Sequence, residues 1–215
     1  MPTTGVDPAS FRQLGRITAR LHLHSQSWQK PGGFQRLRWD HHSMVSANSH
    51  WGDWRDAPGL QESDYALVEE AITNIGREMR AFGQSSARYG LIHADLRLTN
   101  LLLHRGETRV IDFDDCGMGW YLHDLAAAIS FVEHHPHAAQ WIEHWLAGYE
   151  QVAHLGDEEI AVLPAMLMQR RIQLTAWVAS HQQTEMARSL GKGWCGDTLR
   201  LCRRYLEGEQ LPVGI

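Results

Sequence analysis

Apolar residues recur every three or four positions along most of the chain, which predicts a largely helical protein. The first helix is predicted to begin at a Ser10 cap and to run to about Ser27. A second helix is predicted to begin at a Ser63 cap and to end before Gly90. Further helical segments are predicted over residues 121–132, 138–152, 157–168, 169–188 and 194–207.

The segment between the first two helices has no sustained period. Residues 31–61 are rich in Trp, Gly, Asp and Pro, so we expect an ordered loop with short helical pieces. Burial of Trp39, Trp51 and Trp54 is expected to hold this loop against the core.

Three short runs in the middle of the chain are β-like: Leu91–His93, Leu101–Leu103 and Arg109–Phe113. The fold class predicted is therefore α+β, mainly α, in a single domain spanning residues 1–215. Its expected parts are a tail (1–9), leading helices with the Trp-rich loop (10–90), the β-like centre (91–116) and a helical remainder (117–215).

Composition narrows the function classes. Hydrophobic residues make up 43% of the 215-residue chain and charged residues 21%, which is typical of a packed globular protein. The net charge of −5 argues against nucleic-acid binding. No apolar run is long enough to cross a membrane. Three cysteines without a Cys-x-x-Cys pair, and no visible signal peptide, favour the cytoplasm. The oligomeric state is not readable from the sequence.

A candidate site lies where the second and third β-like runs end. A hairpin centred on Gly106 would pair Leu101 with Ile111 and Asn100 with Asp112. Side chains directly opposite each other in such a pair lie roughly 5 Å apart. An amide oxygen and a carboxylate are ligands that suit Mg²⁺ beside substrate phosphates. Asp95, across an irregular loop, is the candidate reacting carboxylate.

Plainer roles are open for each of these residues. Asp and Asn often serve as turn or cap residues, and one of Asp114 and Asp115 can cap the next turn. Asp114 is our third candidate metal ligand. His22 and His24 are two apart on a predicted helix and cannot share a face, so the two histidines do not make a site with each other.

The motifs HADLRLTN (residues 93–100) and IDFDD (residues 111–115) resemble those of the aminoglycoside phosphotransferase and choline kinase group. These are small-molecule kinases with a protein-kinase-like fold. The resemblance implies that Asp95 is the catalytic base and that Asn100 and Asp112 hold Mg²⁺ on the phosphates of ATP. It also implies that Asp124 braces the catalytic loop. His93 is expected to support this loop through its backbone.

The sequence departs from the family wording at three places. Ala94 replaces a glycine, which we expect to be tolerated because alanine is small. Arg97 stands where the family often has His and protein kinases have Lys, so a cation is still expected near the transferred phosphoryl group. Leu98 and Thr99 replace Pro-Gly, leaving the spacing from Asp95 to Asn100 intact.

The largest departure is at the N-terminus. Only nine residues precede Ser10, no Gly-x-Gly-x-x-Gly occurs, and neither Lys30 nor Lys192 lies in a strand pattern. The resemblance therefore covers the C-terminal lobe alone, and the β-rich lobe that clamps the nucleotide is expected to be absent. Without that clamp we expect weak ATP binding and slow turnover.

The expected activity is ATP- and Mg²⁺-dependent transfer of the γ-phosphoryl group to the hydroxyl of a small molecule. The acceptor is not identified, although the net acidity of the chain suits a cationic one. One alternative is a non-catalytic binding module, or a truncated remnant of a phosphotransferase. Another is a metal-dependent hydrolase that uses the same carboxylates.

Overall fold

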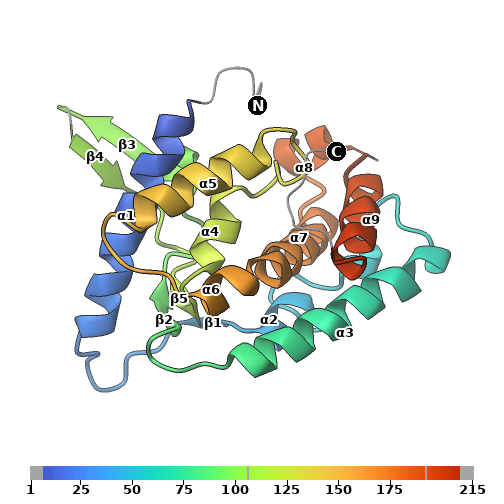
Figure 1. Ribbon diagram of the computed structural model, residues 1–215. Helices are drawn as coiled ribbons and strands as arrows, with labels where there is room; N and C mark the ends of the chain where they lie inside the picture. The colour runs from blue at the N-terminus through green and yellow to red at the C-terminus, as the bar shows by residue number, and fades with distance from the viewer. Residues whose placement is uncertain (1–6, 106, 192, 209–215) are drawn as a thin grey trace.

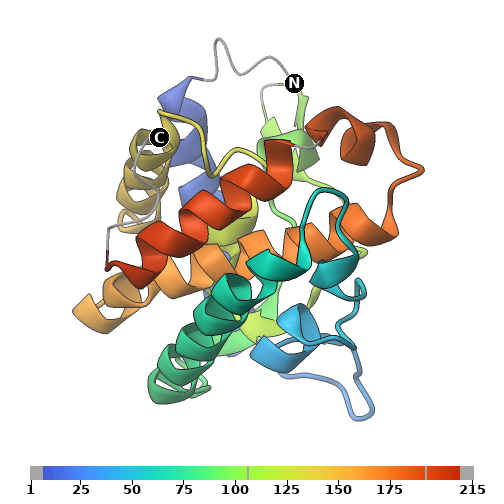
Figure 2. The same cartoon turned by 90° about the vertical axis from the view of Figure 1, so that its right-hand side faces the viewer.

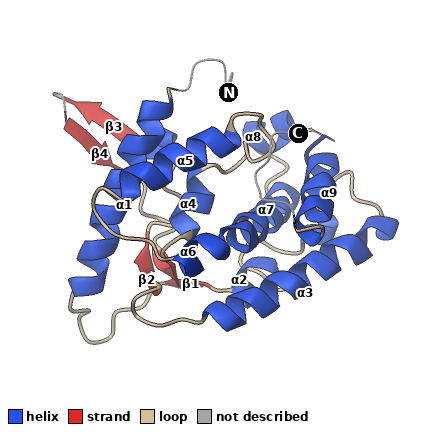
Figure 3. Ribbon diagram, in the orientation of Figure 1, coloured by secondary structure: helices blue, strands red, loops and turns tan. Residues whose placement is uncertain are grey.

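The computed structural model describes residues 7–105, 107–191 and 193–208. Helices dominate it, and two small sheets lie toward one side of the molecule (Figures 1 and 3). The predicted turn centre Gly106, the second lysine Lys192 and the first six residues of the predicted tail fall outside the described residues. Within the described ranges, no helix is both long enough and apolar enough to span a membrane.

Helical segments occur on both sides of the strands, as the apolar spacing predicts. The α-helices are α1 (Pro8–Ser27), α2 (His41–Val45), α3 (Tyr65–Phe82), α4 (His123–Ala128), α5 (Ala138–Tyr149), α6 (Asp157–Ala161), α7 (Leu163–Ser180), α8 (Glu185–Leu190) and α9 (Gly193–Leu206). Short 3-10 turns are η1 (Trp54–Asp56), η2 (Glu62–Asp64) and η3 (Leu98–Asn100).

The strands form two separate sheets. The first has the order β1 (Leu37–Trp39), β5 (Gly117–Trp120) and β2 (Tyr89–Ile92), with β5 parallel to β1 and antiparallel to β2. The second is an antiparallel hairpin of β3 (Leu101–His104) and β4 (Glu107–Val110). The hairpin projects from one side of the molecule in Figure 1. The polypeptide that links the two sheets contains both candidate motifs.

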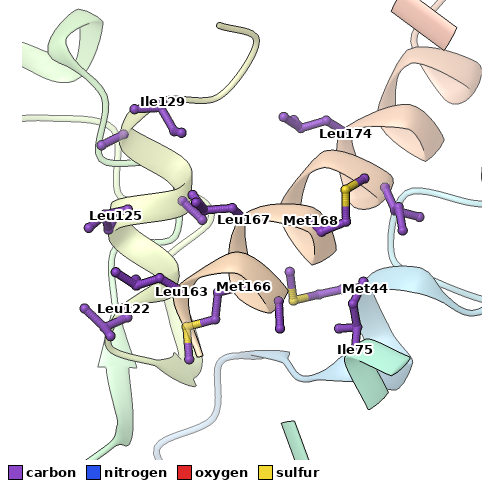
Figure 4. Packing of buried hydrophobic residues seen from close by; sticks show 14 of the residues in the cluster. Met44, Ile75, Leu122, Leu125, Ile129, Leu163, Met166, Leu167, Met168 and Leu174 are labelled. Carbon is purple, nitrogen blue, oxygen red and sulfur yellow. The ribbon is translucent and has the colours of Figure 1, made fainter. Parts of the chain in front are cut away.

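Helix α7 forms the centre of the helical body. Nearly all of its side chains are buried, polar ones included, because α2, α3, α4 and α9 surround it. Figure 4 shows Leu163, Leu167 and Leu174 of α7 among apolar side chains of α4, α2 and α3. Figure 2 shows α9 and α3 crossing in front of α7. Polar groups enclosed in such a core must find partners inside the protein.

Helices α1 and α5 pack closely, and glycine makes this possible. A Cβ atom on Gly15 would overlap the backbone carbonyl of Trp145, and one on Gly148 would overlap that of Arg12. The two helices thus approach through a glycine on each side. This contact fixes α1, whose His22 reaches the candidate site.

The predicted helix starts need correction. Helix α1 begins at Pro8, and its N-cap is Asp7 rather than Ser10, so the helix begins three residues earlier than predicted. Ser63 is not a cap: it lies within η2, and α3 follows an Asp64 N-cap. Proline in the first helical turn and a preceding aspartate are the stronger start signals.

Later boundaries also differ from the prediction. Helix α7 is continuous through residues 168 and 169, where a break was predicted, and the actual break comes before Leu163. The segment predicted as helix over 121–132 is helical only in α4, and Phe131 has a left-handed φ of 73°. In the Trp-rich loop, Trp39 and Trp54 are 1% exposed, and Trp51 packs against the core.

Two strands were not predicted, β1 in the Trp-rich loop and β5 in the sequence GMGW. Strand β5 has no alternation of apolar and polar residues. Its glycines lie under the side chains of Trp39 and Ile92, where a Cβ atom would clash. Space for neighbouring side chains, rather than side-chain propensity, explains glycine in this strand.

Candidate active site

The hairpin register differs by one residue from the prediction. Leu101 pairs with Val110 rather than Ile111, and His104 pairs with Glu107. The backbone N–H of Ile111 donates to the Asn100 carbonyl at 3.0 Å, so Asn100 lies opposite Ile111 and not Asp112. The connection therefore has two residues instead of three, and Arg105 has the positive φ (52°) that such a loop requires.

Asp112 consequently lies beyond the ladder, not within a strand running to Phe113. Its φ is 67°, in the left-handed region that a non-glycine residue enters at a cost of roughly 1–2 kcal/mol. The direction of its exposed side chain is set by this local conformation instead of by the strand pleat. Such strain at a carboxylate beside a loop is typical of functional sites.

Asp95 is held by three side chains. The Asn100 amide donates to its carboxylate at 3.1 Å and to its backbone carbonyl at 2.8 Å. Arg97 donates through Nε at 3.1 Å and through its NH2 group at 3.1 Å. Arg170 of α7 donates to Oδ1 at 3.0 Å. The site thus brings Asp95, Arg97 and Asn100 together, and it adds an arginine that the sequence did not indicate.

Asp124 is hydrogen-bonded to the loop that carries Asp95. Its carboxylate accepts from the backbone N–H of Ala94 at 2.7 Å and of His93 at 3.2 Å, and it contacts His22 Nε2 at 3.0 Å. Burial by itself would raise the pKa of Asp124, but the hydrogen bond and charge of His22, with His93 and His123, hold that pKa below its usual value. The left-handed φ of Ala94 (67°) explains the glycine usual there.

His93 and His22 both serve this loop. His93 Nε2 contacts the Ile111 carbonyl at 3.1 Å, which ties the loop to the base of the hairpin. His22 Nδ1 contacts the Tyr149 hydroxyl at 2.9 Å, and its ring is 1% exposed. The contact of His22 with Asp124 was not predicted from the sequence. The spacing of His22 and His24 excludes a site made by those two, but not a contact with another element.

The acidic loop after Asp112 is fixed by groups from the Trp-rich segment. Arg36 donates to the backbone carbonyls of Phe113, Asp114 and Cys116 at 2.6–2.8 Å. Burial raises the pKa of Asp115, and the negative charges of Asp95, Asp112 and Asp114 raise it further, whereas the charge of Arg170 lowers it. Negative charge is therefore concentrated in this loop.

The candidate metal ligands of this site would need oxygen atoms of a bound substrate to complete the coordination of a divalent cation. Among the described residues, no three His, Cys, Asp or Glu side chains converge as metal ligands. Asn100 and Asp112, with Asp114 in the same loop, supply hard oxygen atoms, and a cation bound to them would need further oxygens from phosphate groups. The assignment of these three residues as ligands stays a prediction.

A cavity of about 530 Å³ opens beside the loop that carries Asp95. Arg97, Leu98 and Thr99 form one wall, so Arg97 touches both this cavity and Asp95. The other walls combine aliphatic, polar and aromatic side chains and include Phe131, whose ring lies 5.5 Å from the Arg97 guanidinium. Polar and aromatic lining residues outside the catalytic loop include Phe11, Ser130, His134, Trp141, Trp194 and Asp197.

Comparison with known proteins shows which family the sequence resembles. The sequence model of the phosphotransferase enzyme family matches residues 3–163. Among curated proteins, the chain is 24% identical over 172 residues to amicoumacin kinase of Bacillus subtilis (strain 168) and 27% identical over 169 residues to homoserine kinase of Gluconobacter oxydans (strain 621H). These matches cover 75% and 76% of this chain but only 48% and 51% of those proteins.

Solved kinases share the fold. A microcompartment-associated aminopropanol kinase is 40% identical with a TM-score of 0.87, over 94% of this chain and 64% of that one. An amicoumacin kinase in complex with AMP-PNP and Ca²⁺ is 22% identical with a TM-score of 0.67, over 94% and 60%. The predicted resemblance and the mainly helical, kinase-like fold class are confirmed, whereas the absence of a β-rich lobe stays a prediction.

Proposed function

The chain belongs to the phosphotransferase enzyme family, and from this premise we propose that it transfers the γ-phosphoryl group of ATP, with Mg²⁺, to a hydroxyl of a small molecule. The observation that carries the proposal is the position of Arg97, which contacts the Asp95 carboxylate on one side and lines the cavity on the other. A hydroxyl held against the Arg97 wall of this cavity would lie beside the guanidinium that contacts the Asp95 carboxylate.

Each residue has a role in the proposed reaction. Asp95 accepts the proton of the acceptor hydroxyl as its oxygen forms a bond to the γ-phosphorus and the bond to the β-γ bridging oxygen breaks. Arg97 supplies positive charge beside the transferred group. Asn100, Asp112 and Asp114 would hold the divalent cation, and the chemistry it would supply is neutralisation of charge on the phosphates. His93 and Asp124 keep the loop in place.

The acceptor that fits best is an amino alcohol. The lining residues include Asp197, a carboxylate that pairs with Arg200, and the aromatic rings of Phe131 and Trp194, whose faces attract cations, as their contacts with Arg97 and Arg171 show. The similarity to an aminopropanol kinase supports the same class of acceptor. The chain spans 64% of the length of that kinase.

The test is ADP release with 1-aminopropan-2-ol as acceptor, measured for wild type and Asp95→Ala. We expect Asp95→Ala to lose at least about 100-fold in kcat, which is the usual contribution of a general base. The matched control is Asp56→Ala, which removes an exposed carboxylate of η1 and should retain full activity. Transfer that persists in Asp95→Ala would remove Asp95 from its role.

The two alternatives give different results in the same assay. A binding module would bind Mg-ATP, measured by calorimetry, without releasing ADP. A metal-dependent hydrolase would release phosphate at the same rate with and without acceptor. Transfer that requires both the acceptor and Asp95 would exclude both alternatives.

A further inference from the structure

We infer that Arg170, in the middle of α7, is the positioning residue for Asp95 and fixes this carboxylate relative to the wall of the cavity. Its catalytic consequence rests on the function proposed above, whereas the pairing itself does not. Three observations lead to it: the complete burial of Arg170, the partners of its guanidinium, and the contrast with the neighbouring Arg171.

Arg170 is oriented by every group around it. It is 2% exposed, and its Nε donates to the Ser130 hydroxyl at 3.0 Å, while its two terminal nitrogens donate to Gln173 at 3.1 Å and to Asp95 at 3.0 Å. The ring of Trp51 lies 5.1 Å from its central carbon. A planar guanidinium with these partners has no freedom to rotate.

Asp95 is the main counter-charge of this buried cation. Burial lowers the pKa of Arg170, and the charge of Asp95 is the largest influence that opposes the shift. Arg97 donates to the same Asp95 oxygen, but Arg97 belongs to the loop and its side chain is 24% exposed. Of the two arginines, Arg170 is therefore the one held by the core, and it ties the base to the helical body.

The partner on the other side of Arg170 belongs to the cavity. Ser130 lines it, and the next residue, Phe131, has a left-handed φ of 73° and stands in the cavity wall. One guanidinium thus joins the proposed base to the wall that an acceptor would touch. Such a bridge sets the distance between base and acceptor, to which transfer rates are sensitive.

The neighbouring Arg171 is also buried in α7, but its guanidinium has other partners than Asp95. It is 1% exposed and pairs with the buried Glu133 at 2.8 Å, and it also donates to Thr198 and to the Trp194 carbonyl. None of these contacts involves Asp95. Arg171 therefore provides a matched control for the burial of an arginine in α7.

The first experiment does not depend on activity. Thermal unfolding is measured for wild type, Asp95→Asn, Arg170→Met and the double variant. Asp95→Asn should lower the Tm of wild type, because it leaves the buried Arg170 without its counter-charge. The same change should leave the Tm of Arg170→Met unchanged or raise it. An equal loss of Tm in both backgrounds would overturn the pairing.

The second experiment separates kcat from KM. Arg170→Lys keeps the charge but not the planar guanidinium that reaches Ser130, Gln173 and Asp95 together, and it should lower kcat at least about tenfold while the acceptor KM changes less than twofold. Gln173→Met loosens Arg170 without touching the cavity and should shift kcat in the same way. Arg171→Lys should lower the Tm while kcat per folded molecule stays within about twofold of wild type; because the Arg171 guanidinium lies 3.3 Å from the Trp194 ring of the cavity wall, its effect on transfer should appear in the acceptor KM and not in kcat.

The outcomes are distinguishable. If wild type transfers phosphate and both Arg170→Lys and Gln173→Met retain its kcat, the positioning role is wrong and the proposed function stands. If wild type shows no transfer, the proposed function fails, and the thermal cycle still decides whether Arg170 holds Asp95.

Discussion

Replacing Asp124 by Asn tests how the catalytic loop is held. The carboxylate accepts three hydrogen bonds, from the backbone N–H groups of His93 and Ala94 and from His22. An amide keeps one acceptor oxygen, for example toward Ala94, and turns an NH2 group toward the other two donors. His22 can adapt by changing its tautomer, but the His93 N–H is left unpaired. We therefore expect a loss of about 2–4 kcal/mol in the free energy of unfolding.

The pH dependence of this loss has a definite sign. Because the pKa of Asp124 is lowered in the folded protein, its charged form stabilises the fold fully above the unfolded pKa of about 4. That contribution disappears as the pH falls through the folded pKa. The difference between wild type and Asp124→Asn should thus be largest at pH 7 and shrink in acid. Titrating groups that do not interact with Asp124 are common to both proteins and cancel in the difference, whereas His22, His93 and His123 lose the influence of its charge in the variant.

Urea unfolding followed by tryptophan fluorescence measures both quantities. Asp157→Asn, an exposed carboxylate at the start of α6, is the matched control and should cost less than about 0.5 kcal/mol. A loss below about 1 kcal/mol for Asp124→Asn at pH 7 would contradict the bracing role, since one unpaired buried N–H alone costs that much. An equally large difference at pH 3 would contradict the pKa argument.

Two further predictions concern packing and buried histidine. Gly15→Ala should destabilise the protein by about 1–3 kcal/mol through the Trp145 carbonyl, whereas Gly196→Ala, open in α9, should stabilise it by up to about 1 kcal/mol in the same urea assay. Burial lowers the pKa of His123 to about 3, so only the unfolded chain binds a proton there between pH 6.5 and 3 and stability falls as the pH falls. Wild type should lose about 2 kcal/mol by pH 5 through this group, and His123→Leu should lack that part of the slope, while an unchanged slope would contradict it.

The sequence was informative where the pattern is local. Helical spacing located most helices, and the motifs around Asp95 and Asp112 indicated the site and the family. The exact register failed because the hairpin length depends on one residue of the turn, which apolar spacing does not determine. Strand β5 was missed because its glycines are explained by the side chains of Trp39 and Ile92, which are distant in sequence.

Arg170, His22 and Arg36 show the limit more clearly. Each reaches the site from an element far along the chain, and each looks unremarkable in its own segment. The spacing of Arg170 within its helix gives no sign that its guanidinium meets a carboxylate 75 residues away. Only the packing of α7 against the loop brings the two together, and sequence periodicity contains no information on that approach.

The β3–β4 hairpin stands out from the body of the molecule, with Asn100 and Asp112 at its root and the turn at its far end (Figure 1). The candidate metal ligands therefore lie at the root of the hairpin, away from the exposed far end of β3. Leu103, which is 73% exposed, is a suitable attachment point for a fluorophore or an affinity tag, because a label there would lie away from the root, which is anchored through Ile111 to His93.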